Sequence, residues 1–243
     1  MYVITFANPK GGSGKTTSAM LLAEQIAASG GRVAVLDLDP NANIVAWARA
    51  RESEGRGVPF AVHARPQAEE TVGLIDGLAD EADYLIVDLE GSKDQIVTFA
   101  LSRTDLCIIP LDGSPMEARQ AAQAVKLVQS TSKMIRAPIA YALLFARTNA
   151  AFQTTDERDV RQAMEASAIA TLPVSIARRA PYTRIFRDSV LLSELPAIVT
   201  AEMKGKGASA TDKALKQVSS AIDNARDYAQ AVINALVEGK KAA

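Results

Sequence analysis

Two lysines, three glycines and two threonines lie within nine residues near the amino terminus, a combination that can bind phosphate and a divalent cation. The segment 9–17 reads PKGGSGKTT, follows an apolar run over residues 2–8, and precedes apolar residues at helical spacing over 15–29. A strand, a glycine-rich turn and a helix in this order are typical of a phosphate-binding loop. The first backbone amides of a helix are unsatisfied and carry partial positive charge, so they attract phosphate. Glycines let the backbone wrap the anion because they carry no Cβ atom.

The side chains of this segment indicate how a nucleotide and its cation would be held. Lys15 would reach the β- and γ-phosphates, and the Thr16 hydroxyl would ligate Mg²⁺. We expect the nucleotide to contact Gly11, Gly12, Ser13, Gly14, Lys15, Thr16 and Thr17. The alternative is a glycine-rich turn that binds nothing, and the strand before it and the helix after it argue against that alternative.

Acidic residues follow two further apolar strands. Asp37 and Asp39 come after the run 32–36, and Asp88 closes the run 84–87. Continuous apolar strands joined by helices predict an α/β fold, a mostly parallel twisted sheet with helices on both faces. Ligands of such sheets bind beyond the carboxyl ends of the strands, so the acids and the glycine-rich loop are expected at one edge. An acid in the position of Asp88 holds Mg²⁺, usually through water.

Lys10 makes this loop different from the usual phosphate-binding loop. Pro9 stands where the usual pattern has glycine, and two lysines share the loop in the pattern KGGxGKT. This pattern resembles the deviant P-loop of the ParA/MinD family of ATPases. The resemblance implies that Lys10 crosses a dimer interface and touches the partner's nucleotide, while Lys15 is the ordinary lysine. It also implies that Asp39 orients the attacking water and that Asp37 supports the Mg²⁺ shell.

Other loops match the family less closely. Segment 41–43 reads NAN where the family usually has QGN, and segment 89–91 reads LEG where it often has TPP. A γ-phosphate would repel Glu90 unless this side chain points away or binds a cation. The polar turn after the predicted strand 139–146 is similar to a segment near the adenine in ParA proteins, which makes Asn149 a candidate base contact. A polar turn without that role is the alternative.

Composition limits the class of protein. Net charge is -1, with 27 basic and 28 acidic residues, so the whole chain is not a basic nucleic-acid binder. Apolar residues make up 48%, which suits a large core. The single cysteine, Cys107, excludes a disulfide framework and fits a reducing compartment. We find no secretory signal and no apolar run of transmembrane length, so we expect a cytoplasmic protein.

Any contact with DNA would therefore need a local basic patch. Four arginines lie within ten residues, interleaved with Tyr182 and Phe186, and two lysines follow in a segment, 201–211, that we interpret as a flexible basic loop. These candidates for contact with the DNA backbone are Arg178, Arg179, Arg184, Arg187, Lys204 and Lys206. A solvated helix face is an equally weighted alternative.

We interpret residues 1–243 as a single P-loop ATPase domain with a C-terminal helix over about 211–238 packed on it. The apolar seam of that helix has heptad spacing but includes alanines, which favours packing on the chain's own sheet over a free coiled coil. Segment 172–176 is predicted to be the last strand. Segment 41–54 is predicted to be a helix with a mixed, solvated charged face formed by Arg49, Arg51, Glu52 and Glu54.

The resemblance implies a switch enzyme that hydrolyses ATP with Mg²⁺ and depends on dimerisation. Its ATP-bound homodimer would bind DNA without sequence preference and associate with the nucleoid. An activating adaptor protein, ParB-like or linked to a cargo, would trigger release, and the cellular task would be partition of a plasmid or chromosome or positioning of a cargo complex. The alternatives are a MinD-like membrane-associated regulator and a metabolic P-loop enzyme of the same fold. The mixed charge of the last helix argues against membrane attachment.

Overall fold

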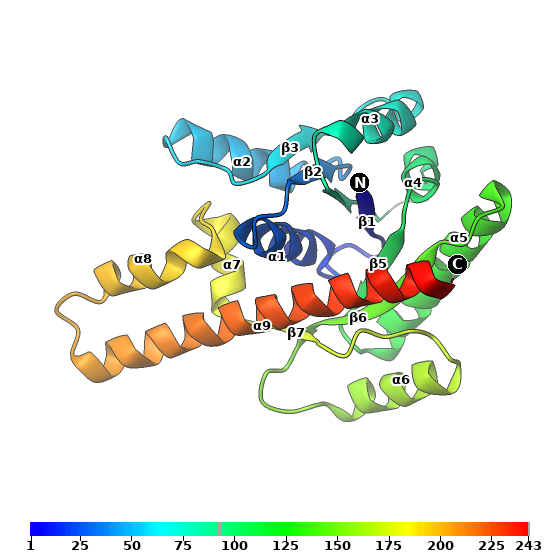
Figure 1. Ribbon diagram of the computed structural model, residues 1–243. Helices are drawn as coiled ribbons and strands as arrows, with labels where there is room; N and C mark the ends of the chain where they lie inside the picture. The colour runs from blue at the N-terminus through cyan, green and yellow to red at the C-terminus, as the bar shows by residue number, and fades with distance from the viewer. Residues whose placement is uncertain (92–93, 243) are drawn as a thin grey trace.

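A parallel seven-stranded sheet forms the centre of the computed structural model, which describes residues 1–91 and 94–242 (Figure 1). Its order is β3-β2-β4-β1-β5-β6-β7, and every neighbouring pair is parallel. The expected α/β fold is therefore confirmed. The strands are β1 Tyr2–Phe6, β2 Val33–Asp37, β3 Ala61–Ala64, β4 Tyr84–Asp88, β5 Leu106–Leu111, β6 Ala140–Thr148 and β7 Ile176–Ala177.

Helices cover both faces of the sheet because alternate strand residues point to opposite sides and nearly all of them are apolar. Ile4 and Phe6 of β1 face one core, and Val3 faces the other. The first core packs under α1, α2, α7, α8 and α9, and the second packs under α3 to α6. The helices are α1 Lys15–Ala28, α2 Asn43–Ser53, α3 Thr71–Gly77, α4 Gln95–Leu101, α5 Pro115–Ile135, α6 Thr155–Ala166, α7 Ala180–Arg187, α8 Leu195–Glu202 and α9 Ala208–Ala242, with short 3₁₀ turns at Ala68–Glu70, Leu78–Asp80 and Leu192–Glu194.

The C-terminal helix α9 runs across one face of the molecule, beside α1 and over the β5–β7 end of the sheet (Figure 1). Its inner face buries Val218, Ala221, Ala225, Tyr228, Val232 and Leu236. The Tyr228 hydroxyl donates to the Ser18 carbonyl at 3.2 Å, which ties α9 to the helix that follows the glycine-rich loop. Packing on the chain's own core is thus what the structure shows. Within the described ranges, no helix combines the length and hydropathy needed to cross a bilayer.

Two predicted elements differ from the structure. Segment 172–176 is not a continuous strand, because Pro173 has no N–H to donate and the pairing with β6 stops after Leu172 and resumes at Ile176. The predicted loop over 201–211 is also shorter, since α8 ends at Glu202 and α9 begins at Ala208.

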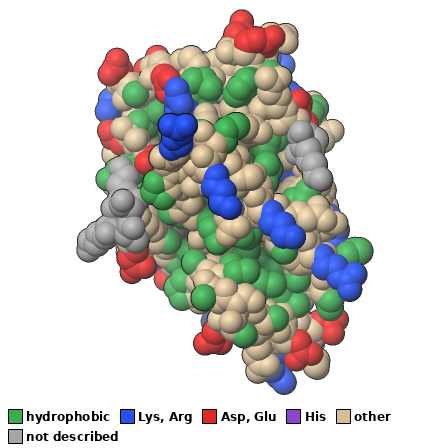
Figure 2. Space-filling model, turned by 90° about the vertical axis from the view of Figure 1, so that its right-hand side faces the viewer, with side chains coloured by type: hydrophobic (Ala, Val, Ile, Leu, Met, Phe, Trp, Pro, Cys, Tyr) green, Lys and Arg blue, Asp and Glu red, His purple; other side chains and the backbone are tan. Residues whose placement is uncertain are grey.

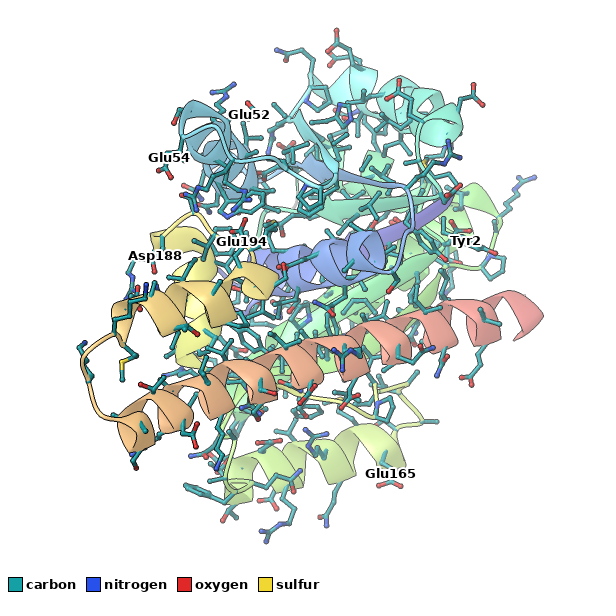
Figure 3. All side chains as sticks on the ribbon, turned by 60° about the vertical axis from the view of Figure 1, so that its left-hand side comes forward. Tyr2, Glu52, Glu54, Glu165, Asp188 and Glu194 are labelled. Carbon is teal, nitrogen blue, oxygen red and sulfur yellow. The ribbon has the colours of Figure 1, made fainter. Side chains whose placement is uncertain are left out.

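Arg51 corrects a third expectation, because it lies inside the molecule and not on a solvated face. Its side chain is 2% exposed and pairs with Glu194 at 2.7 Å, next to the Trp47 ring. The guanidinium also donates to the carbonyls of Gly57 and Ser189. Figure 3 shows the labelled Glu194 beside the end of α2, so this ion pair joins the buried Arg51 of α2 to the segment before α8.

Candidate nucleotide-binding site

The glycine-rich loop lies at the carboxyl edge of the sheet, between β1 and α1. Gly14 precedes the first residue of α1 and has a φ of 103°, a conformation that L side chains rarely adopt. A Cβ atom at Gly14 would lie 3.2 Å from the Cβ of Ala146, so a side chain there would press on the end of β6. The loop therefore needs glycine at this position both for its turn and for its close approach to β6.

Lys15 directs its ammonium into the loop. The Nζ atom donates to the Asn8 carbonyl at 3.1 Å and to the Lys10 carbonyl at 3.3 Å. Burial lowers the pKa of Lys15, while nearby carboxylates, Asp88 first among them, oppose that change. A phosphate oxygen can replace these carbonyl acceptors and adds a full negative charge, so this ammonium is ready to bind an anion.

A cavity of about 630 Å³ opens in front of the loop. Loops that follow β1, β2 and β4, together with the end of β6, form its walls, as expected for ligands at the carboxyl ends of parallel strands. Its lining includes seven of the predicted site residues, namely Gly11, Gly12, Gly14, Lys15, Thr16, Thr17 and Asp39. Lys10, Ser13, Asp37, Asp88 and Asn149 lie outside this lining.

A second cavity of about 350 Å³ adjoins the first and shares Gly14, Thr17 and Arg147 with it. Apolar and aromatic groups of β6, β7 and α7 form much of its wall, which is the character of a pocket for a flat ring. Its remaining lining residues are Ser18, Ala146, Ile176, Ala177, Arg178, Arg179, Tyr182, Thr183 and Phe186. Asn149 is not among them, and its Oδ1 accepts a hydrogen bond from the Ala151 N–H at 2.8 Å.

Asp88, at the end of β4, is fully buried. Neither carboxylate oxygen makes a hydrogen bond of ordinary geometry, although the nearby Thr16 hydroxyl favours the charged form. Burial raises the pKa of Asp88 from its usual 3.8 to about 7. An unpaired buried carboxylate beside a threonine hydroxyl is a donor set that suits a hard divalent cation.

A magnesium ion at Asp88 and Thr16 would need further ligands from outside the protein. Within residues 1–91 and 94–242, no three His, Cys, Asp or Glu side chains gather as a metal cage. Mg²⁺ usually binds through one or two protein groups, with waters and substrate phosphates completing its octahedron. The arrangement therefore fits a cation that arrives with a nucleotide.

The two acids after β2 have different surroundings. Asp37 is buried, and its Oδ2 accepts the N–H groups of Ile44 at 2.9 Å and Val45 at 3.2 Å, at the start of α2. Asp37 thus caps α2 and fixes the loop that carries Asp39. Asp39 is half-buried at the cavity wall, and its Oδ1 accepts the Asn41 backbone N–H at 2.8 Å. Only Asp39 of this pair lines the cavity.

Arg65 provides the cation that Glu90 requires. One guanidinium nitrogen donates to Glu90 Oε2 at 2.8 Å and to the Leu38 carbonyl at 2.8 Å. This arginine therefore links the loop after β2 to the loop after β4. The neighbouring Gly91 lies so close to the glycine-rich loop that a Cβ would be 2.6 Å from the Pro9 carbonyl oxygen. Arg65 thus fixes Glu90 next to the loop after β2, and the missing side chain of Gly91 allows the backbone to approach the glycine-rich loop.

Lys10 points away from its own cavity. Its Nζ donates to Glu117 Oε1 at 2.7 Å, near the start of α5. The Lys10 side chain is 33% exposed, whereas that of Glu117 is fully buried. The two lysines of the loop therefore have different surroundings, one inside the loop and one paired with α5.

The basic residues suggested for DNA binding divide into two groups. Arg184 pairs with Asp188 at 2.6 Å and with Glu202 at 2.7 Å, and Arg187 pairs with Asp188 at 2.7 Å. Figure 3 labels Asp188, which lies beside α7. Arg178, Lys204 and Lys206 are exposed, and Arg179 donates to the Ser220 hydroxyl at 3.0 Å. The patch read from the sequence is thus partly neutralised on the folded surface.

Arg147 is a site residue that the sequence analysis did not single out. It has a φ of 58°, at an irregularity in the pairing of β6 with β7. Its Nη1 donates to the Gly12 carbonyl, and its side chain lines both cavities. Its position directly after a predicted strand was the available signal. That signal is weak, because basic residues are common in turns that follow strands.

Arg147→Ala is expected to weaken ATP binding about ten-fold, because one charge-assisted contact at the junction of the two cavities is lost. Titration with a fluorescent ATP analogue measures this change. The matched control is Arg158→Ala, since Arg158 is an exposed arginine on α6 that lines neither cavity. Equal affinities for the two variants would show that Arg147 makes no contact with the nucleotide.

The sheet order, the loop after β1 and the acids at the same edge define a P-loop nucleotide-binding protein. Residues 4–240 match the family model described as the CobQ/CobB/MinD/ParA nucleotide binding domain. The chain belongs to this family and, by its two-lysine loop, is a ParA/MinD-family ATPase.

Comparisons with individual proteins agree with this assignment. A protein named ParA from Rhizobium radiobacter is 28% identical over 240 residues, which cover 98% of this chain and 99% of the relative. The fold is similar to that of a McdA variant from Cyanothece in complex with ATP, with a TM-score of 0.66, 20% identity, and coverage of 92% and 96%. A putative plasmid partition protein from Borrelia burgdorferi bound to AMPPNP gives a TM-score of 0.62 at 17% identity, with coverage of 78% and 90%.

Proposed function

We propose that this protein hydrolyses ATP with Mg²⁺ as an ATP-dependent homodimer that partitions DNA or positions a cargo complex. The observation that carries the proposal is the different placement of the two lysines of the loop. Lys15 is buried against the loop carbonyls, while Lys10 extends to the side and lines no part of its own cavity. A lysine so placed contacts Glu117 and not its own cavity, so the nucleotide that it would reach on leaving Glu117 is that of a neighbouring subunit.

Within one subunit, Lys15 and the loop amides would bind the phosphates, and the second cavity would take the base. Thr16 and Asp88 would hold Mg²⁺, which would supply positive charge to offset the negative charge of the phosphates. Asp39, at the cavity wall, would orient the attacking water. Asp37 would support this arrangement through its cap on α2.

Across the dimer, Lys10 would place its ammonium on the partner's phosphates. A cation supplied in this way stabilises the charge of the transition state, as an arginine finger does in other P-loop enzymes. Hydrolysis would then need two subunits and would be slow at low protein concentration. An adaptor protein linked to DNA or to the cargo would accelerate the step by stabilising the competent dimer.

Duplex DNA would be the track, bound through phosphates and without sequence preference. Exposed Lys204 and Lys206 remain available for this contact, whereas the exposed Arg178 also lines the second cavity. Helix α5 adds exposed Arg119, Lys126 and Lys133 at seven-residue spacing, which is nearly two turns and places them on one side of the helix. Figure 2 shows the side of the molecule on which α5 lies, with Lys and Arg side chains spaced across it and Asp and Glu mostly toward its margins.

The test is binding to non-specific duplex DNA with ATP, with ADP and without nucleotide, each at low and moderate salt. We expect binding only with ATP, and we expect it to weaken as salt rises because counterions are released from the phosphates. Lys204→Ala with Lys206→Ala should reduce the affinity, whereas Arg187→Ala, at a residue paired with Asp188, is the matched control. Absence of binding in every nucleotide state would rule out DNA as the track and leave the ATPase proposal to the hydrolysis assay.

A further inference from the structure

The Lys10–Glu117 pair joins the glycine-rich loop to α5 across 107 residues of sequence. Glu117 is the third residue of α5, which begins at Pro115, and its backbone N–H donates to the Ser114 hydroxyl at 3.3 Å. Glu117 Oε2 accepts the Asp112 N–H at 2.6 Å, and Oε1 accepts from Lys10. The start of α5 and the Asp112 N–H therefore fix the position of this carboxylate independently of Lys10.

Lys10 and Glu117 differ in burial, and therefore in how much each depends on the other. The Glu117 side chain is fully buried, so its charge has lost its hydration and depends on the partners that the protein supplies. Lys10 is one-third exposed and can exchange its partner through solvent. Removal of Lys10 leaves Glu117 with the Asp112 N–H, the partial positive charge of the helix start and the more distant charge of Lys15, which offset only part of the lost interaction.

While its ammonium lies 2.7 Å from the buried Glu117 carboxylate, Lys10 lines no part of the cavity, so it has to leave Glu117 to extend to a phosphate on another subunit. We propose that Glu117 is a positioning residue that retains Lys10 within its own subunit and thereby opposes formation of the ATP dimer. This inference rests on the proposed function, because it requires that Lys10 leaves Glu117 to reach a partner's nucleotide. The buried carboxylate then sets the concentration of subunits at which hydrolysis begins.

The test is Glu117→Gln, which keeps the size of the side chain and an oxygen for the Asp112 N–H but removes the charge. The expected result is a ten-fold lower dissociation constant of the dimer with a non-hydrolysable ATP analogue, which corresponds to about 1.4 kcal/mol. Sedimentation measures this constant. The rate of hydrolysis should rise at low protein concentration and should reach the wild-type maximum at high concentration, because Lys10 is intact in the dimer.

Glu157→Gln is a matched control on the next helix. Glu157 is also the third residue of its helix, α6, is 3% exposed, has its N–H bonded to the capping Thr154 and pairs with Arg161 at 2.8 Å. The same chemical change there leaves Lys10 untouched and should leave the dimer constant unchanged. If Glu117→Gln does not fold, as judged by circular dichroism, Glu117→Asp shortens the reach to Lys10 while keeping the charge, and a two- to three-fold lower dimer constant is expected.

The outcomes separate this inference from the proposed function. A dimer constant for Glu117→Gln equal to that of Glu157→Gln, or one that rises, overturns the retaining role of Glu117; if Glu117→Gln does not fold, an unchanged or higher constant for Glu117→Asp overturns it equally. If Lys10→Ala abolishes hydrolysis in that same experiment, only the retaining role fails. If Lys10→Ala leaves dimerisation and hydrolysis intact, the crossing lysine itself is wrong. In the double variant Lys10→Ala with Glu117→Gln, the effect of Glu117→Gln on the dimer constant should disappear, because the retained group is absent.

Discussion

Replacing Lys10 by alanine is expected to lower the rate of ATP hydrolysis about 10³-fold while leaving ATP binding by the subunit almost unchanged. The Lys10 side chain lines neither of the two cavities and donates to Glu117. Its loss therefore removes no contact to the nucleotide of its own subunit. In the proposed dimer its loss would remove a cation that acts on the partner's phosphates. Hydrolysis measured over a range of protein concentrations, together with nucleotide titrations, checks both parts.

Two comparison variants make the Lys10 result specific. Lys15→Ala should lose ATP binding itself, because its ammonium lies inside the loop. Lys213→Ala changes an exposed lysine on α9 and should leave both properties unchanged. Lys10→Ala also leaves Glu117 buried without its cation, so urea unfolding must accompany the assay. Wild-type hydrolysis by a folded Lys10→Ala protein would exclude the crossing-lysine mechanism.

The loop could be predicted from the sequence because its chemistry is local. The glycines, Lys15 and Thr16 lie in one short segment, and a strand before and a helix after them fix how they fold. Asp37 and Asp88 each end an apolar run and Asp39 follows two residues after Asp37, so these acids were predicted near the loop, because parallel strands bring their carboxyl ends to one edge. Periodicity and position were enough for these residues.

Other parts of the site depend on partners that are distant in sequence. Nothing local distinguishes Arg147, which reaches Gly12 across 135 residues. Arg51 looked like one more charge on a helix surface, and its burial depends on Glu194 and the Ser189 carbonyl, 143 and 138 residues away. Arg184 looked like part of a basic patch until Asp188 and Glu202 paired with it. The sequence shows where charged residues lie along the chain. Which of these charges remain free to bind a ligand depends on ion pairs formed in the folded protein.

Asp88 shows how a site residue can reduce the stability of the protein that carries it. The folded protein raises the pKa of Asp88 from 3.8 to about 7 by burial, so the charged form is disfavoured in the fold. Asp88→Asn is therefore expected to stabilise the nucleotide-free protein above pH 7 by up to about 4 kcal/mol, since each pKa unit corresponds to about 1.4 kcal/mol. The same change should abolish Mg²⁺-dependent hydrolysis, because the carboxylate that would hold the ion is lost.

The pH dependence distinguishes this cause from ordinary repacking. Because the pKa of Asp88 is higher in the folded protein, its contribution to wild-type stability is fully present below pH 4 and is lost as pH rises through about 7. Asparagine does not titrate, so the advantage of Asp88→Asn should grow from pH 4 to about 7 and stay constant above. Asp76→Asn, at an exposed residue paired with Arg103, should change stability by less than about 0.5 kcal/mol. Urea unfolding at pH 5, 6, 7 and 8 measures the difference in free energy of unfolding. If the advantage of Asp88→Asn is independent of pH, ionisation of Asp88 does not destabilise the folded protein.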